Sequence, residues 1–147
     1  MKTRALVMAG VMALTVMAST RVARAQELMV VNVPFDFVAG NTTLPAGEYS
    51  VKVSGPQNAL LLIDRDDATA AVFLTSNAAV ANEIQSESKL VFNRYGDRYF
   101  LSQVWTAGSS RGRQLRKSGR EKEIAQTAKI ETQGRVTLVA SLLRTNP

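Results

Sequence analysis

A run of cations is the densest group of chemically active side chains in this 147-residue sequence. Six basic residues fall within 12 positions: Arg111, Arg113, Arg116, Lys117, Arg120 and Lys122. Such a run attracts phosphate or carboxylate groups on lipid, polysaccharide or nucleic acid, and the attraction weakens as salt rises. No aromatic residue is interleaved with the cations, so we do not expect nucleic acid bound by base stacking. The simpler alternative is a solvated loop and helix start whose charge balances the rest of the chain.

Acidic residues offer a second chemistry, metal binding. Asp64-Arg65-Asp66-Asp67 places three carboxylates in four residues, which suits a hard cation such as Ca²⁺. The glycine and distal glutamate of a helix-loop-helix calcium site do not accompany them. A solvated turn between two strands explains the same residues, so we expect a turn and no metal site.

Catalysis is the third possibility, and composition restricts it severely. The chain contains neither Cys nor His, which excludes thiol catalysis, Ser-His-Asp systems and His-ligated zinc or haem. A carboxylate pair for hydrolysis of a glycosidic bond remains available from Asp36, Glu48, Asp64 or Asp97. Nothing in the sequence singles out two of the four. We therefore expect no catalytic residues and no cofactor, with a small carboxylate-dependent hydrolase as an alternative.

The first 25 residues have the pattern of a secretory signal peptide. Lys2 and Arg4 precede an apolar run of 14 residues, and Ala23-Arg24-Ala25 supplies the small residues of a cleavage site. A membrane-spanning helix needs about 20 residues, so we expect cleavage instead of a retained anchor. The mature chain then begins near Gln26. We predict an exported protein, periplasmic or extracellular, with no membrane span after cleavage.

Residues 26–147 form one domain's worth of chain, and its two parts differ in charge and aromatic content. Residues 26–105 contain five basic and nine acidic side chains, a net charge of −4, while residues 106–147 contain nine and three, a net of +6. All nine aromatic residues lie between Phe35 and Trp105. Since aromatic rings dominate protein cores, we expect residues 26–105 to supply most of the packed body. The basic loop and helix at about 108–132 would cover it.

Short runs with strand periodicity recur at intervals of about ten residues. Strict alternation at 29–37 predicts a half-buried strand, which Pro34 places at an edge or a bulge. The continuous apolar run 60–63 predicts a strand covered on both faces. The clearest hairpin joins 89–95 to 98–105 across Gly96-Asp97. Further strands are expected at 48–53, 72–75 and 136–142, and 76–87 is ambiguous between a loop and a helical turn.

One helix is expected after a flexible polar link at 108–113. Ser118 and Glu121 match a capping box, in which each side chain accepts a hydrogen bond from the other's backbone N–H. The predicted fold is therefore mainly β: a small antiparallel β-sandwich or barrel of about seven strands with one C-terminal helix. The residues expected to be buried are Phe35, Phe37, Tyr49, Val51, Leu62, Phe92, Phe100, Trp105 and Leu138.

Four stretches also resemble a group of small exported β-rich proteins of soil bacteria. They are Val33-Pro34-Phe35-Asp36-Phe37, residues 44–51, residues 95–101 and the basic run that opens a helix near Ser118. That group has no assigned activity, so the resemblance implies a compact exported β-protein and nothing catalytic. We expect a non-catalytic exported module with a binding or structural role at the cell envelope. An alternative is a binder of anionic envelope polymer or lipid through 111–122, and another protein also remains open as a partner.

Overall fold

The computed structural model describes residues 28–54, 59–67, 71–129 and 132–143; the predicted signal peptide lies outside this part. It is mainly β, with a single helix in the described part, which confirms the predicted fold class. The elements are β1 (Leu28–Val33), β2 (Phe37–Ala39), β3 (Thr42–Leu44), β4 (Gly47–Ser54), β5 (Ala59–Asp64), β6 (Ala71–Leu74), β7 (Asn77–Val80), β8 (Ser88–Tyr95), β9 (Arg98–Trp105), β10 (Arg111–Gln114), α1 (Gly119–Thr127) and β11 (Gln133–Leu143).

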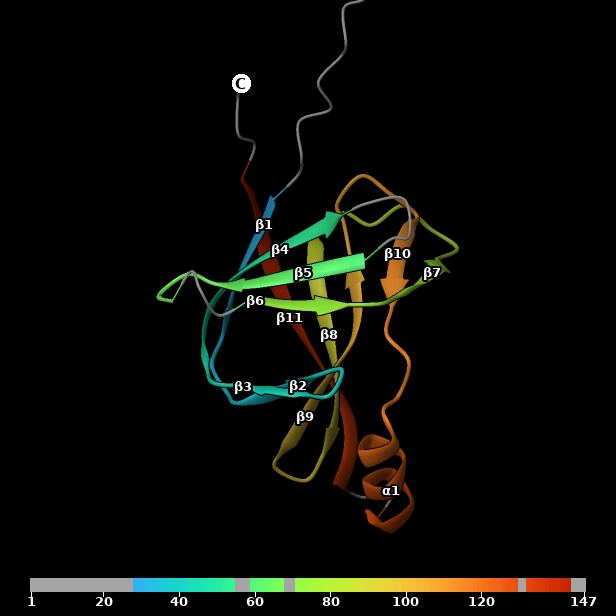
Figure 1. Cartoon of the computed structure of the whole chain (residues 1–147). Coiled ribbons are helices and arrows are strands. Elements are labelled where there is room, and N and C mark those ends of the chain that lie inside the picture. Colours follow the sequence, from blue (N-terminus) through green and yellow to red (C-terminus); the bar gives the residue numbers. More distant parts are fainter. Residues whose placement is uncertain (1–27, 55–58, 68–70, 130–131, 144–147) are drawn as a thin grey trace, which may run out of the picture.

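The strands form one curved, nearly closed, barrel-like sheet (Figure 1). Their order is β3-β2-β9-β8-β11-β1-β4-β5-β6, and β10 adds to β9 and carries β7 on its other side. β6 and β7 are separated only by Thr75 and Ser76, so the chain itself links the β6 end of the order to the branch formed by β10 and β7. In the described part of the chain β6 pairs only with β5, so its other edge is open and forms a seam in the sheet.

The hairpin predicted across Gly96-Asp97 is confirmed. Tyr95 pairs with Arg98 in antiparallel register, which leaves a two-residue connection between β8 and β9. Gly96 has a φ of 65°, a value that glycine adopts without steric cost and that primed turns require at their first central position. The hairpin brings the aromatic residues of β8 and β9 to the centre of the sheet.

The core lies inside the curved sheet and is centred on aromatic rings. Seven of the nine residues predicted to be buried are buried, and Phe35 and Leu138 pack against the core while remaining partly exposed. The Phe92 ring meets those of Phe35 and Phe37 edge-on, with centroids 5.3 and 5.4 Å apart. Phe35 in turn stacks on Tyr99 at 3.8 Å, so it closes the rim of the core.

Two expectations for the first half are wrong in detail. The run 29–37 is not one strand, because β1 ends at Val33 and β2 begins at Phe37; Pro34, which has no N–H for a ladder, lies in the break. The run 60–63 is not covered on both faces: Leu60 and Leu62 are buried, whereas Leu61 and Ile63 are half-buried.

In the described ranges the sheet has eleven strands where about seven were predicted, and β3, β7 and β10 lie where no strand was expected. Residues 111–113 of the predicted flexible link form β10 together with Gln114, and the ambiguous stretch 76–87 contains β7. They pair with each other from Arg111 opposite Val80 to Gln114 opposite Asn77. These short strands, Asn-Ala-Ala-Val and Arg-Gly-Arg-Gln, have weak local β propensity. They exist because each pairs with the other, which lies far away in the sequence.

Candidate anion-binding site

The first two cations of the basic segment, residues 111–122, lie on β10 and flank a glycine. Gly112 pairs with Trp105 of β9, and a Cβ placed on Gly112 would lie 2.5 Å from the indole ring. Only glycine, which has no Cβ, leaves room for the indole ring here. Arg111 is exposed and Arg113 is half-buried, and both line a hollow of about 490 Å³ together with Val53 and Val104.

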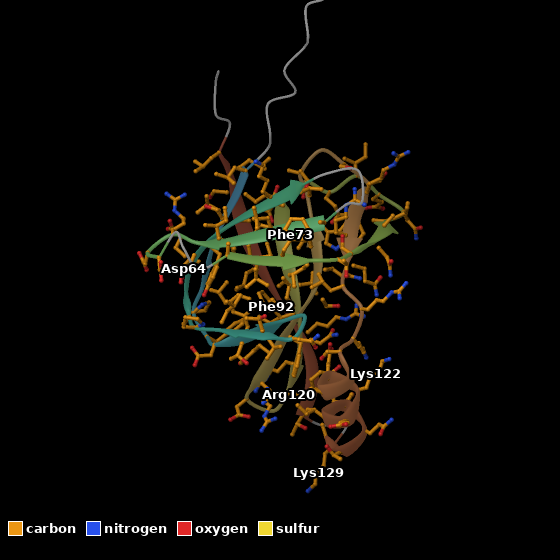
Figure 2. The ribbon with its side chains drawn as sticks, in the orientation of Figure 1. Asp64, Phe73, Phe92, Arg120, Lys122 and Lys129 are labelled. Atoms are coloured by element: carbon orange, nitrogen blue, oxygen red, sulfur yellow. The ribbon has the colours of Figure 1, made fainter. Side chains whose placement is uncertain are left out.

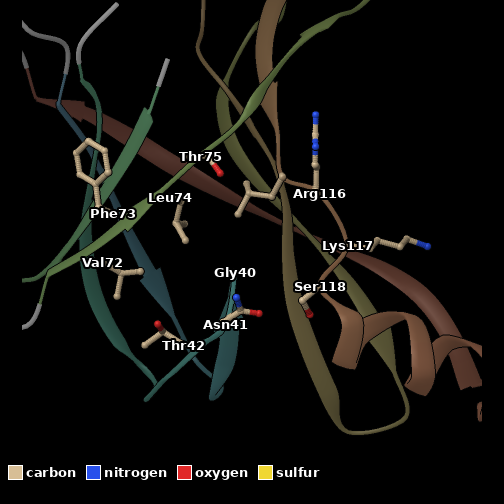
Figure 3. A pocket seen from close by; sticks show the side chains of 11 residues that line it. Gly40, Asn41, Thr42, Val72, Phe73, Leu74, Thr75, Arg116, Lys117 and Ser118 are labelled. Carbon is tan, nitrogen blue, oxygen red and sulfur yellow. The ribbon is translucent and has the colours of Figure 1, made fainter. Parts of the chain in front are cut away.

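The next two cations follow β10 in a link that is anchored to the core. Leu115 is buried, and its N–H donates to the carbonyl of Ser102 at 2.8 Å. This anchor leaves Arg116 and Lys117 exposed beside the seam of the sheet, where they help to line a hollow of about 390 Å³. Figure 3 shows the Lys117 side chain directed away from that hollow.

The last two cations lie on the first turn of α1, whose start differs in part from the predicted capping box. Ser118 accepts a hydrogen bond from the Glu121 N–H at 3.1 Å, as expected. The Glu121 carboxylate has another role: it is buried and accepts from Asn93 Nδ2 at 2.9 Å and Tyr95 Oη at 3.1 Å. This contact fixes α1 against β8 and leaves Arg120 and Lys122 exposed to solvent.

The contact also changes the acidity of the phenol. Burial raises the pKa of Tyr95 above its usual value of 10.0, the Glu121 charge raises it further, and Lys117 nearby lowers it by a smaller amount. Tyr49, which donates to the Pro45 carbonyl at 2.7 Å, has a raised pKa because of burial and then the charges of Asp64 and Asp36. The fold therefore favours the protonated form of both hydroxyls over the phenolate.

We expect these two tyrosines to make the protein sensitive to alkali. A proton bound more tightly in the folded state stabilises it fully below pH 10, and this stability is lost as pH rises through the folded pKa. The free energy of unfolding, measured by urea titration at intervals from roughly pH 9 to pH 11.5, should fall over that range. A Tyr49→Phe, Tyr95→Phe variant should show a flatter profile, and an equally steep profile would contradict the assignment.

The acidic residues considered as a metal site form a turn at the end of β5. Asp64 Oδ1 accepts from the backbone N–H of Asp66 at 2.9 Å and of Asp67 at 3.3 Å, and Arg65 pairs with Glu48. Within the described ranges no group of three Asp, Glu, His or Cys residues could hold a metal ion. In Figure 2 Asp64 and Lys122 lie on opposite sides of the molecule, so this turn does not neutralise the basic segment.

Two of the four carboxylates considered for hydrolysis share a shallow hollow. Asp36 and Asp97 line a space of about 210 Å³ with Arg98, Tyr99 and Arg120. Asp36 Oδ1 also accepts from the Ala46 N–H at 2.9 Å, which holds the turn before β4. Asp36 therefore has a structural role, and two cations share the space with the carboxylates. This arrangement gives no support to the hydrolase alternative.

The six cations thus lie along one continuous segment but do not converge on one pocket. Five of them are exposed, and Arg113 is half-buried with contacts of its own. The structure records no ion pair between the five exposed cations and any described acid. The segment presents a ribbon of charge from β10 to α1, a shape suited to an extended or flat anionic partner.

Sequence reasoning missed the exposed apolar side chains near this ribbon. Phe73 on β6 is 65% exposed, Val80 on β7 is 76% exposed and Ile84 is 70% exposed. Successive residues of a strand point to opposite faces of the sheet, so Phe73 faces outward because its neighbour Leu74 is buried. The sequence shows that the two residues face opposite sides. Which of the two neighbours faces outward becomes evident only from the pairing of β6 with β5.

Comparison with known proteins adds no functional information. A scan against protein-family models finds no match, and searches of the curated proteins and of the solved structures find no significant similarity. No helix among the described residues has the length and hydropathy needed to cross a lipid bilayer. The function must therefore be inferred from the geometry of the site itself.

Proposed function

We propose that this protein is an exported, non-catalytic β-module that binds an anionic component of the cell envelope through the basic segment 111–122. The observation that carries the proposal is the exposure of five cations on one segment with no described acid paired to them. If these cations only balanced the net charge of −4 on residues 26–105, we would expect them to contact the acidic residues of that part of the chain. The shared chemistry of the partner is a surface rich in phosphate or carboxylate groups.

The rigidity of the segment supports this function. β10 is held between β9 and β7, Leu115 is anchored in the core, and the buried Glu121 fixes the first turn of α1. The cations therefore project from a pre-formed scaffold, which reduces the conformational entropy lost on binding. Arg120 and Lys122 lie in the first helical turn, where cations oppose the helix dipole, and an anionic partner would relieve that conflict.

Replacing three of the exposed cations should abolish most of this binding. Each basic residue near an anionic lipid surface contributes roughly 1 kcal/mol, so Arg111→Gln, Arg116→Gln and Lys122→Gln together should weaken the affinity roughly 100-fold. The measurement is co-sedimentation with phosphatidylglycerol vesicles and retention on a polyanion resin, each across a salt series. Vesicle binding without resin retention identifies a lipid surface, and the reverse identifies a polymer. The melting temperature should barely change.

A variant with the same charge change elsewhere provides the control. Lys52→Gln, Lys89→Gln and Arg135→Gln remove three cations from β4, β8 and β11, outside the segment, and should leave retention nearly intact. The proposal fails if both triple variants behave alike, or if the first one unfolds, since the cations would then belong to the fold.

Export with cleavage makes a separate prediction. Protein recovered from the exported fraction should have the intact mass of a chain that begins at or near Gln26. An intact mass that includes Met1 would contradict export with cleavage.

A further inference from the structure

We propose that the free edge of β6 binds an extended acidic peptide as an added β-strand. This site lies at the seam of the sheet. It shares Arg116 with the basic segment 111–122, but it does not depend on the anionic envelope partner proposed above. It rests on three features of the seam: an unpaired strand edge, a hollow beside that edge, and a cation at one end of it.

The edge of β6 is open for hydrogen bonding on one side. β6 pairs with β5 from Leu60 opposite Leu74 to Ile63 opposite Ala71, and it has no second strand neighbour in the described part of the chain. Alternate residues of an edge strand direct their N–H and C=O groups away from the sheet. Natural edges are usually protected by charge, proline or a bulge, whereas β6 consists of Ala71, Val72, Phe73 and Leu74.

A hollow of about 390 Å³ lies along this edge (Figure 3). One wall is the turn between β2 and β3, with Asn41 and Thr42, and the other is the link that carries Arg116 to Ser118. In Figure 3 Leu74 and Asn41 point into the space, while Phe73 points away from it. The four residues of β6 span about 13 Å, so the edge matches a short extended segment.

These surroundings define the chemistry of the peptide. A strand paired with β6 would place alternate side chains beside Phe73 on the outer face, where an apolar residue would cover the exposed ring. Arg116 is exposed and lies next to Thr75, where β6 passes into β7, so it would attract a carboxylate. The expected occupant therefore combines an apolar residue with acidic ones.

A second copy of the protein fits the seam less well. Two β6 edges placed side by side would bring together both sets of flanking walls, the turn at 40–42 and the link at 116–118, and would place two Arg116 side chains in the same region. A single extended peptide meets neither obstacle. Addition of a peptide strand to an exposed edge is also a common mode of recognition in which the backbone supplies affinity and alternate side chains supply specificity.

Selection from a displayed library of random eight-residue peptides tests the proposal. Peptides enriched on the full mature protein should contain more Asp and Glu than the starting library. A synthetic copy of the most enriched peptide should bind Arg116→Glu at least tenfold more weakly and Phe73→Ala severalfold more weakly. Both side chains are exposed, so the two variants should fold. Hydrogen exchange of the β6 amides should slow when this peptide binds.

Two matched controls test whether the peptide binds at the seam. Amides of β11, which pairs with β1 and β8 and contributes no residue to the hollow, should exchange at the same rate with and without the peptide. Lys122→Gln, which is part of the anionic-surface test, should not alter peptide binding, so failure of one proposal is distinguishable from failure of the other. The proposal is overturned if no acidic peptides are enriched, if β6 exchange is unaffected, or if sedimentation shows a dimer whose β6 amides are already protected.

Discussion

Replacing Phe92 by alanine should destabilise the protein by about 3–5 kcal/mol, which is the usual loss for removing a fully buried aromatic ring. Phe92 is 0% exposed and its ring contacts those of Phe35 and Phe37, which lie on either side of Asp36. The cavity left by the missing ring would therefore lie between β8 and the segment from Phe35 to Phe37. Urea unfolding followed by Trp105 fluorescence measures the change.

The control for this substitution is Phe73→Ala. Phe73 is also a phenylalanine on a strand but is 65% exposed, so its removal should change the free energy of unfolding by less than about 0.5 kcal/mol. Equal effects of the two substitutions would show that burial in this core does not determine stability. Because small domains are stable by only about 5–15 kcal/mol, the Phe92 variant should lose a large fraction of its total stability.

Replacing Glu121 by alanine should destabilise the protein by about 2–4 kcal/mol, since it removes the charged acceptor of two buried hydrogen bonds. Asn93 Nδ2 and Tyr95 Oη would both lose their partner, and the first turn of α1 would lose its attachment to β8. Thermal unfolding followed by circular dichroism measures the loss. The exposed Glu123, two positions along the same helix, supplies the control, and Glu123→Ala should shift stability by less than about 0.5 kcal/mol.

A further substitution separates lost hydrogen bonding from lost packing. In the Glu121→Ala background, Tyr95→Phe removes one of the two unsatisfied donors and should cause less destabilisation than the same change in the wild-type protein. Additive effects would instead indicate that Glu121 stabilises the helix without acting through Tyr95. This double-mutant comparison also tests whether the carboxylate is the link between α1 and the sheet.

Local features of the fold were predictable from the sequence, and features created by distant pairing were not. The hairpin at Gly96-Asp97 and the start of α1 at Ser118 depend on residues within a few positions of each other, so their patterns are visible in the sequence. β10 was missed because Arg-Gly-Arg-Gln has little strand propensity and becomes a strand only between β9 and β7. The alternation of 29–37 was real, but Pro34 divided it into two strands.

The candidate site shows the same division. The cations of 111–122 could be identified from charge density alone, and so could the turn at Asp64. The role of the Glu121 carboxylate could not, because its partners Asn93 and Tyr95 lie 28 and 26 residues away in the sequence. The edge of β6 was equally invisible, since an unpaired edge is a property of the whole sheet order and not of the four residues that form it.

The pairing of β1 with β11 places Leu28 directly opposite Leu143. Both strands begin or end at the same pole of the barrel, and α1 lies at the other pole (Figure 1). A reporter or a surface tether fused to these strand ends would therefore be attached at the pole opposite α1 and leave Arg120 and Lys122 accessible. The same adjacency makes the domain suitable for circular permutation: a short linker between these two ends, with new termini opened in the Gly96-Asp97 turn, would preserve every strand pairing described above.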